Sequence, residues 1–505
     1  MEKITLVREC SNLENYYFLV TVSGSQSSVI VAASYGNRDG SQKLTRDKLI
    51  RALAKIVVEQ PALGMVVLRQ PSEKKDKDML WLGRFETLDV SECVNFIDVE
   101  GDDPADISRR MLEDLFDDWF DPSEPSRPLW KVTVVNMETV FFAFNHLVCD
   151  GRSGYFFHRC LLSALNNDNE ASHSQTPTKF IVNQGSWPEF YKETIAKHHR
   201  LNLFIFILTY LFQMVVELLC VPKYMAYSDL RRYKQKVSLK ELAPAEKRIK
   251  NKVVSLRIDS ETMNKLLPLC RKNSTTFTAF FDTLLNVSLC ADAYPDALFA
   301  RTGIVVDLRS MCEYPHGEVL SNMASSWTKL RRASRFATIG KHRGERDQNK
   351  DTVYTNIPEF WAMAKHRKDD MNKNLEAGAI SESLQINLVS RYIDDYPTQV
   401  YDELHTTRNF SSLISNLVVL APREEDKNKE WYFTAADWAS STVRSSAGQA
   451  LNVCITSAIG ADCVINLGYE EGTYDQDVIP RLARIMQSRI RQILGDEDAG
   501  VTVRS

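Results

Sequence analysis

One histidine in the sequence is placed where it could move a proton. It lies in the segment N-H-L-V-C-D-G, residues 145–151, which follows an apolar run and precedes a helical pattern beginning near Ser153. A histidine at the end of a buried strand is held by rigid backbone and can still face a cleft, which suits a general base. Its ordinary pKa of about 6.5 lets His146 accept a proton at neutral pH and return it later. Asp150 could orient this loop or pair with a distant cation, and Gly151 would permit the backbone geometry of the turn.

The spacing H-x-x-x-D-G is not specific by itself, and three other readings fit the same residues. A partly buried histidine beside a helix-capping aspartate would have the same spacing. A metal site is a second alternative, because His146, Asp150 and His158 offer ligand chemistry; the first two, however, straddle a strand-to-helix turn and do not share a helix face. Covalent catalysis by Cys149 or Ser153 would need a base that the sequence places beside neither. We expect proton transfer without a metal.

A hairpin is expected to position this histidine. Residues 130–135 predict one strand, residues 136–138 a turn, and residues 139–144 a second strand that ends at Asn145. The second strand, T-V-F-F-A-F, is apolar on both faces, which predicts a central place in a sheet. Earlier in the chain, residues 28–34 predict a strand, a helix capped by Thr45 ends before Pro61, and residues 107–119 predict another helix.

The length of 505 residues favours two domains. Residues 225–252 are rich in Lys and Arg and poor in large apolar side chains, which predicts a solvated linker between domains at 1–224 and 253–505. The second half predicts strands at 252–258, 305–308, 413–420, 451–457 and 463–469, and helices from 275 or 276 to 290 and at 481–494. Each half is thus expected to be a mixed α/β unit. The charged stretch 331–351 is expected to be a mobile surface insertion.

Composition excludes some functions. A net charge of −4 and a pI of about 6.2 give no basic surface for nucleic acid. The ten cysteines form no C-x-x-C pair, which argues against structural zinc and for a reduced, intracellular protein. The first residues lack the apolar core of a secretory signal. We therefore expect a cytoplasmic protein.

One long apolar segment, residues 201–221, bears on membrane contact. Its polar exceptions are Asn202, Thr209, Gln213 and Glu217, whose spacing places them on one helical face. An acid within the run disfavours a transmembrane span. We expect an amphipathic helix that packs against its own protein or, as the alternative, lies on the surface of an internal membrane.

Together, these segments resemble a known family. Residues 145–151, preceded by P-L-W-K-V at 128–132, are similar to the CoA-dependent acyltransferase superfamily that includes chloramphenicol acetyltransferase. The likeness is greatest to the fungal alcohol acetyltransferases, because five further landmarks occur in the same order: R-E-C-S-N-L-E-N-Y at 8–16, Q-P-A-L at 60–63, T-T-F-T-A at 275–279, V-D-L-R at 306–309 and I-S-N-L at 414–417. The resemblance covers about residue 8 to about residue 470. Asn145 replaces the first of two adjacent histidines that condensation domains carry, and only Asp437-Trp438 matches the D-F-G-W-G of the plant branch. Both departures favour the fungal branch.

The resemblance implies a fold, a reaction and a set of site residues. It implies two chloramphenicol-acetyltransferase-like domains with a channel between them, entered by acetyl-CoA or another acyl-CoA from one mouth and by the acceptor, a small alcohol or a secondary metabolite, from the other. His146 would be the base, and Asp150 would pair with Arg309 to fix the loop. Ser415 would donate a hydrogen bond to the oxyanion, with Asn416 supporting the site, although position 418 is valine where the family often has glycine. No permanently bound cofactor is expected, and a monomer is the default.

Other functions remain open at this point. The same fold could acylate an amine, or could take its acyl group from a carrier protein. A catalytically silent binding protein is a further alternative, as is a membrane-surface enzyme acting on lipids. The identity of the acceptor does not follow from the sequence.

Overall fold

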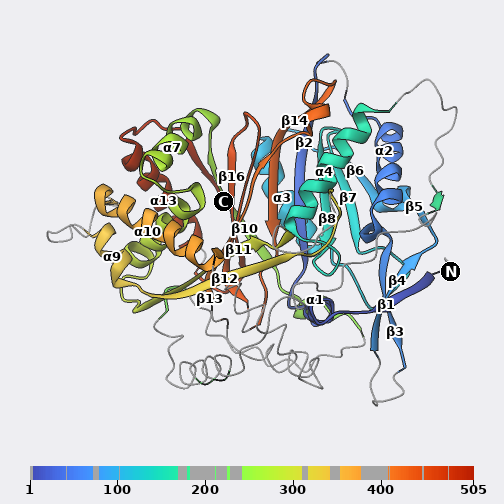
Figure 1. Ribbon diagram of the computed structural model, residues 1–505, viewed down its shortest axis with the longest axis horizontal. Helices are drawn as coiled ribbons and strands as arrows, with labels where there is room; N and C mark the ends of the chain where they lie inside the picture. The colour runs from blue at the N-terminus through green and yellow to red at the C-terminus, as the bar shows by residue number, and fades with distance from the viewer. Residues whose placement is uncertain are drawn as a thin grey trace.

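The computed structural model describes two large β-sheets with their covering helices, side by side (Figure 1). It describes the chain except for residues 1–3, 41–42, 72–78, 102, 169–178, 182–206, 208–210, 212–224, 228–240, 310–316, 342–352, 377–407, 409, 446–447 and 476. The predicted amphipathic segment 201–221 therefore lies almost wholly outside the described residues. No helix among the residues described is both long and apolar enough to cross a membrane.

The first large sheet belongs mainly to the N-terminal half and carries the histidine. Its strand order is β14 (Trp431–Ser440), β2 (Ser28–Asn37), β8 (Thr139–Asn145), β7 (Trp130–Val135) and β6 (Val94–Ile97). As predicted, β8 is central, between β2 and β7. Asn136 and Met137 have φ values of 54° and 53°, the conformation of a two-residue hairpin turn whose twist matches that of the strands. Helices α2 (Arg46–Glu59), α3 (Pro104–Asp117) and α4 (Gly151–Asn166) accompany this sheet.

The second large sheet belongs to the C-terminal half. Its order is β12 (Ala324–Arg332), β11 (Phe299–Asp307), β13 (Phe410–Leu420), β15 (Gln449–Ala458), β16 (Cys463–Glu470), β10 (Asn251–Ile258) and β17 (Val501–Arg504). The accompanying helices are α7 (Ser260–Lys272), α8 (Phe277–Ser288), α9 (Ser334–Gly340), α10 (Ile357–Glu376) and α13 (Val478–Leu494). Each half has its own apolar core. The predicted mixed α/β class is confirmed.

One strand crosses between the halves. β14 comes late in the chain but pairs antiparallel with β2, from Trp431 opposite Asn37 to Ser440 opposite Val29. The two units are therefore not simply consecutive in sequence, because the C-terminal half supplies an edge strand to the N-terminal sheet. The linker at 225–252 lies partly outside the described residues, and the division of the chain there stays a prediction.

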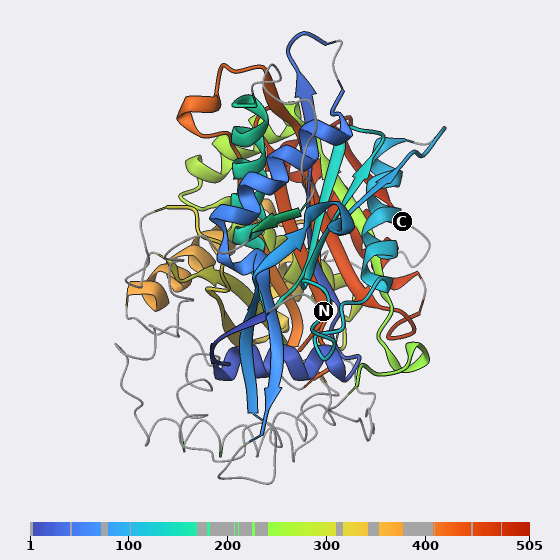
Figure 2. The ribbon, with the colours of Figure 1, turned by 90° about the vertical axis from the view of Figure 1, so that its right-hand side faces the viewer.

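The first helix and a small sheet lie at one end of the N-terminal half. β1 (Ile4–Glu9), β4 (Met79–Phe85) and β3 (Met65–Gln70) form this sheet, and β5 (Thr87–Asp89) pairs with β9 (Lys179–Ile181). Figure 2 shows α1 (Asn12–Val22) lying across the lower end of the molecule beside the strands of the small sheet. Ser11 and Glu14 form a capping box that fixes where α1 begins.

The prediction of a mobile insertion at 331–351 is wrong for its first part. Arg331 belongs to β12, and residues 334–340 form α9. The number of charged residues did not reveal that α9 has an apolar face. Phe336 and Ile339, three residues apart on this helix, both lie in the C-terminal core. Residues 342–352 lie outside the described part of the chain.

His158, on α4, is a buried histidine of the core, and its burial makes the stability of the protein depend on pH. Its Nδ1 is 2.8 Å from the Tyr35 hydroxyl and its Nε2 is 3.0 Å from the Val31 carbonyl oxygen. Burial lowers the pKa of His158 to about 4, against the smaller opposing effect of the Val31 hydrogen bond. The unfolded chain therefore binds more protons than the folded one between pH 6.5 and 4, and stability falls as pH falls through this window.

We expect the wild-type protein to lose about 3 kcal/mol of unfolding free energy through His158 alone between pH 7 and pH 4. Urea unfolding at a series of pH values should show that the free energy of unfolding changes less steeply with pH in His158→Gln than in wild type. His366→Gln, which removes an exposed histidine of α10, is the control. Equal slopes for all three proteins would contradict the prediction.

Candidate active site

His146 follows directly on β8, and its loop leads into α4 (Gly151–Asn166). Asn145, the last residue of β8, is fully buried; its side-chain nitrogen donates to Thr21 and its oxygen accepts from the backbone N–H of Leu147. The turn after the strand is thus held from inside, while His146 is only partly buried. The backbone fixes where the imidazole starts and leaves it accessible.

Asp150 and Arg309 form a buried ion pair that joins the two halves. Arg309 Nη1 donates to Asp150 Oδ2 at 2.9 Å and Nη2 donates to Oδ1 at 3.0 Å. The Arg309 side chain is 8% exposed and that of Asp150 is 2% exposed. Two parallel bonds of this kind fix orientation as well as distance. The loop that carries His146 is therefore tied to the end of β11, as the resemblance implied.

The Asp150 carboxylate also accepts hydrogen bonds from two backbone N–H groups. It caps α4 by accepting from the Ser153 N–H at 2.9 Å, and it accepts from the Met323 N–H at 2.7 Å. Burial alone would raise the pKa of Asp150, but the charge and hydrogen bonds of Arg309 and the two backbone bonds outweigh it, so that the pKa lies below its ordinary value. Asp150 is therefore ionised at neutral pH, and both of its carboxylate oxygens accept hydrogen bonds from within the protein.

Segment 320–323 completes this bridge. The Ser321 carbonyl accepts from Ser153 Oγ at 2.6 Å and from Arg309 Nη2 at 2.8 Å. Asn322, the next residue, donates from Nδ2 to the His146 carbonyl oxygen at 2.7 Å, and the same nitrogen is 3.0 Å from His146 Nδ1. The segment between β11 and β12 thus reaches both the helix cap and the imidazole.

Tyr17 of α1 contacts the imidazole from another direction. Its ring stacks on His146 with 4.3 Å between centroids and 12° between planes.

Burial lowers the pKa of His146; the charge of Asp150 and backbone hydrogen bonds at His146 and Cys149 oppose this shift but have smaller effects. The imidazole is therefore neutral at pH 7, which is the state that can accept a proton.

Gly151 is needed for space, which corrects the reason given from sequence. It is the first residue of α4, and it is not among the glycines with positive φ. A Cβ at this position would lie 3.1 Å from Leu417 Cδ2 and 3.1 Å from the Trp438 ring. Gly151 therefore lets β13 and β14 approach the start of α4 closely.

Ser415 and Asn416 lie on opposite faces of β13. Asn416 donates to Thr278 Oγ1 at 3.0 Å and so ties the strand to the start of α8. Ser415 is 8% exposed. Leu417, two residues further on, lies against Gly151, and the pairing of β13 with β15 becomes irregular after Asn416.

Val418 has a left-handed backbone, with φ of 67°. Such a φ is a genuine outlier for a β-branched residue and favours glycine. Asn416 Oδ1 accepts from the Val418 N–H at 2.8 Å, and the Tyr155 hydroxyl donates to the Val418 carbonyl at 3.0 Å. These bonds hold a strained residue at an irregularity of β13, where pairing with β15 skips from Asn416 to Val419. The family's glycine at this position therefore fits the backbone found here.

We expect Val418→Gly to stabilise the protein by about 1 kcal/mol, because relief of strain of roughly 1–3 kcal/mol exceeds the entropic cost of glycine. Val419→Gly is the matched control: it also removes an exposed valine side chain, from a neighbouring position without positive φ, and should destabilise. Thermal and urea unfolding measure both. Destabilisation of similar size in the two variants would contradict the prediction.

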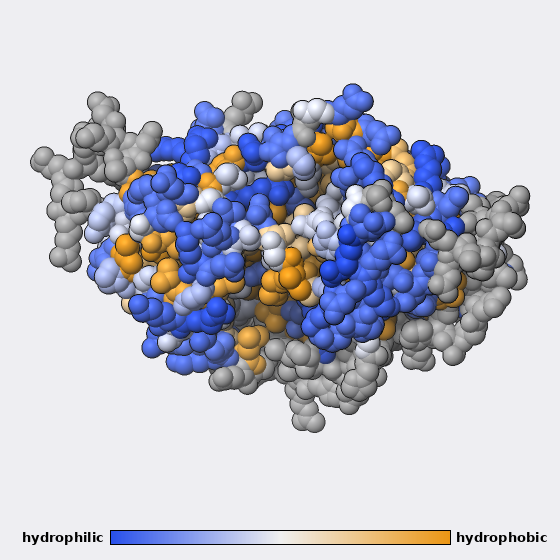
Figure 3. All heavy atoms as spheres, turned by 90° about the horizontal axis from the view of Figure 1, so that it is seen from above, coloured by the Kyte–Doolittle hydropathy of each residue, from blue (hydrophilic) through white to orange (hydrophobic). Residues whose placement is uncertain are grey.

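Apolar side chains also reach the surface around this part of the molecule. Val418 is 60% exposed and Val419 is 45% exposed. Seen from above, the surface is mostly hydrophilic, with apolar patches toward the middle of the molecule (Figure 3).

His158 was the third residue of the metal-site alternative that the sequence left open. Both ring nitrogens of His158 are engaged in hydrogen bonds, and no group of three or more His, Cys, Asp or Glu side chains among the described residues could hold a metal ion.

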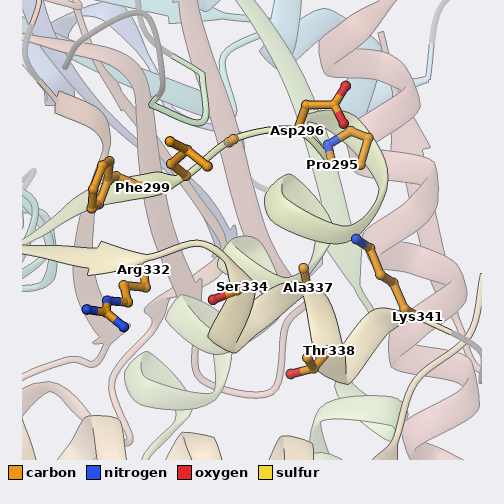
Figure 4. A pocket seen from close by; sticks show the side chains of 10 residues that line it. Pro295, Asp296, Phe299, Arg332, Ser334, Ala337, Thr338 and Lys341 are labelled. Carbon is orange, nitrogen blue, oxygen red and sulfur yellow. The ribbon is translucent and has the colours of Figure 1, made fainter. Parts of the chain in front are cut away.

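A cavity of about 550 Å³ lies at the outer end of β11, lined by Phe299, Arg332 and Lys341 among others (Figure 4). β11 runs nine residues from there toward Arg309, about 27 Å of extended chain. This cavity is therefore separate from the site.

Sequence reasoning missed Tyr17 and Asn322. Tyr17 directly follows the landmark at 8–16, and Asn322 lies between two strands with no pattern of its own. The capping box of α1 was a readable signal for the start of that helix. Nothing in the sequence indicated that either residue would contact His146, because the contacts join residues far apart in the chain.

The fold is shared with solved acyltransferases and condensation domains. TRI3 trichothecene 15-O-acetyltransferase from Fusarium sporotrichioides aligns with a TM-score of 0.66 at 10% identity, covering 95% of this chain and 94% of that one. The first condensation domain of the calcium-dependent antibiotic synthetase aligns with a TM-score of 0.58 at 14% identity, covering 98% and 100%. The class is thus the two-domain, chloramphenicol-acetyltransferase-like fold, as predicted.

The family follows from sequence. The alcohol acetyltransferase family model matches residues 108–478, which is most of the chain and includes the H-x-x-x-D-G segment. This chain belongs to the alcohol acetyltransferase family. An uncharacterized protein of Schizosaccharomyces pombe is 28% identical over 160 residues, which is 31% of this chain and only 32% of that protein.

Proposed function

We propose that the protein is an acyl-CoA-dependent O-acyltransferase that transfers an acyl group, acetyl in the first instance, to the hydroxyl of a small alcohol. The observation that carries the proposal is a neutral, partly accessible His146 on a loop fixed by the buried Asp150–Arg309 pair. A general base needs an unprotonated nitrogen and a fixed position, and this loop supplies both. Membership of the alcohol acetyltransferase family supports the choice of donor and acceptor.

In the proposed reaction His146 accepts the proton of the acceptor hydroxyl as its oxygen attacks the thioester carbonyl. The tetrahedral intermediate then collapses, the carbon–sulfur bond breaks, and the same proton passes to the departing CoA sulfur. The products are an ester and free CoA thiol. No covalent acyl-enzyme forms, because the alcohol oxygen attacks the donor directly while both substrates are bound.

Ser415 is the proposed donor to the oxyanion of the intermediate. Such a donor acts from about 3 Å away and is worth most in a site from which water is excluded. Its support is its place on β13, two residues before Leu417, which packs against Gly151 at the start of α4. Asn416 supports it by fixing β13 to α8.

The test is release of free thiol from acetyl-CoA by the full chain in the presence of a mixed panel of alcohols. We expect release only when an alcohol is present, with the ester as coupled product. Release with amines in place of alcohols would identify an N-acyltransferase. Release only from an acylated carrier protein would identify a carrier-dependent enzyme, and failure with every donor and acceptor would favour a catalytically silent binding protein.

A further inference from the structure

One arginine close to the His146 loop has no anionic partner in the described part of the chain. Arg152 is the second residue of α4, six positions after His146, and it is partly buried. Among the residues that the structure describes, no carboxylate pairs with it and no acceptor takes a hydrogen bond from it; its contacts there are with aromatic rings. The N–H donors of its guanidinium are therefore not used by this part of the protein.

Three other arginines on or against α4 are already paired. Arg309 is bound by the carboxylate of the His146 loop through both of its Nη atoms. Arg159 and Arg423 both pair with Glu318, each at 2.6 Å. Arg152 differs from these three because no carboxylate of the described chain offsets its charge.

Two aromatic rings hold the guanidinium of Arg152 in place. Its Cζ lies 5.7 Å from the centroid of the Tyr155 ring and 5.5 Å from that of the Phe156 ring. These residues follow Arg152 by three and four positions, so all three share one face of α4. Such contacts attract the charge of a guanidinium and leave its N–H donors available. An arginine held in this way is prepared to bind an anion, because it loses little side-chain freedom on binding.

Apolar surface lies beside this cation. The Tyr155 hydroxyl donates to the Val418 carbonyl oxygen at 3.0 Å, so one tyrosine side chain connects the guanidinium to the irregular part of β13. Val418 is 60% exposed there and Val419 is 45% exposed. A ligand that contacts both kinds of group needs an anionic part next to a less polar chain. Phosphate is an anion whose oxygens match the planar fork of an arginine.

We propose that Arg152 binds a phosphate group of the acyl-CoA donor. The inference rests on the proposed function, which supplies the donor, and adds a residue that recognises it. Acyl-CoA carries a diphosphate and a ribose 3′-phosphate at the end of its pantetheine arm that is remote from the thioester. Because the His146 loop leads directly into α4, one donor molecule can present its thioester to the imidazole and a phosphate to Arg152.

Arg152→Met tests this assignment, because methionine keeps an unbranched apolar side chain and removes the charge and the N–H donors. Isothermal titration of the full chain with CoA, in the absence of any acceptor, should give a Kd about 10-fold higher for Arg152→Met than for wild type, since hydrogen bonds to a charged group are lost. Arg484→Met removes an exposed arginine of α13. This control should bind CoA as wild type does.

Two results of the titration would overturn the proposal. The first is an equal Kd for CoA in wild type and in an Arg152→Met protein whose thermal unfolding shows it folded. The second is a wild-type protein that does not bind CoA. If Arg152→Met does not fold, Arg152→Gln makes the same comparison.

Steady-state kinetics give a second readout that a merely structural role would not move. S-acetylpantetheine has the same thioester and arm as acetyl-CoA but no phosphate. The ratio of kcat/KM for acetyl-CoA to kcat/KM for S-acetylpantetheine should fall about 10-fold in Arg152→Met. A ratio equal to that of wild type would overturn the phosphate contact. Binding of CoA that depends on Arg152, in a protein that releases no thiol with any acceptor, would support this contact and reject the proposed function.

Discussion

His146→Ala should lower the alcohol-dependent release of thiol from acetyl-CoA by several hundred-fold, within the roughly 10²–10⁴-fold range that a positioned general base contributes. The expectation follows from the position of the imidazole on the loop after β8 and from its lowered pKa. Alanine removes the proton acceptor and leaves the Asp150–Arg309 pair untouched. KM for acetyl-CoA should change little, since in the proposed reaction the imidazole acts on the acceptor hydroxyl.

Thermal unfolding is the control for this variant and should show a protein about as stable as wild type, because His146 is only partly buried. The wild-type kcat/KM should fall on the acid side with a midpoint below pH 6.5, since the base acts unprotonated and burial lowers its pKa. A His146→Ala protein that releases thiol at the wild-type rate would remove His146 from the reaction.

Asp150→Ala should damage folding as well as turnover. Breaking one side of a buried ion pair costs roughly 3–5 kcal/mol, because the Arg309 guanidinium would be left buried without its partner. Loss of the cap of α4 adds about 1 kcal/mol. Urea unfolding at pH 7 should therefore separate Asp150→Ala clearly from His146→Ala.

A second set of variants tests the cause. Asp150→Asn keeps a side chain that can cap α4 but removes the charge, and it should still lose most of the ion-pair contribution. Removing the guanidinium as well, in Asp150→Asn with Arg309→Met, should recover part of the loss because no buried charge remains. Since the pKa of Asp150 lies below its ordinary value, its contribution is present at neutral pH and is lost as pH falls below about 4. Equal stability of Asp150→Ala and His146→Ala would contradict this assignment.

The local structure around the histidine could be predicted because its causes are local. The β7–β8 hairpin matches the prediction within one residue, since alternation of turn and strand residues sets the register. Thr45 caps α2, as the sequence indicated, and Thr276 caps α8, whose start was predicted at residue 275 or 276. The family landmarks added the Asp150–Arg309 pair, which no spacing rule could have found across 159 positions.

Other features required the whole fold. β14 joins the sheet of the other half, which no composition shift marks, because strand pairing depends on backbone partners supplied from elsewhere. The charge count at 331–351 suggested a mobile surface insertion, although Phe336 and Ile339 are in the core. A high density of charged residues indicates that one face of a helix is exposed, but it does not show whether the opposite face is buried.

By itself, then, the sequence predicted the His146 loop and the strand that carries it, since these depend on residues that are neighbours in the chain, and it marked His146 as the candidate base. Only the tertiary structure decided what surrounds the imidazole. Tyr17 reaches it from α1 and Asn322 from beyond β11, and Gly151 is explained by Leu417 and Trp438 packing against it. Contacts of this kind depend on how separate elements pack against one another. The pattern of apolar and polar residues within one helix or strand shows which face is buried, but it does not specify which distant residue that face will contact.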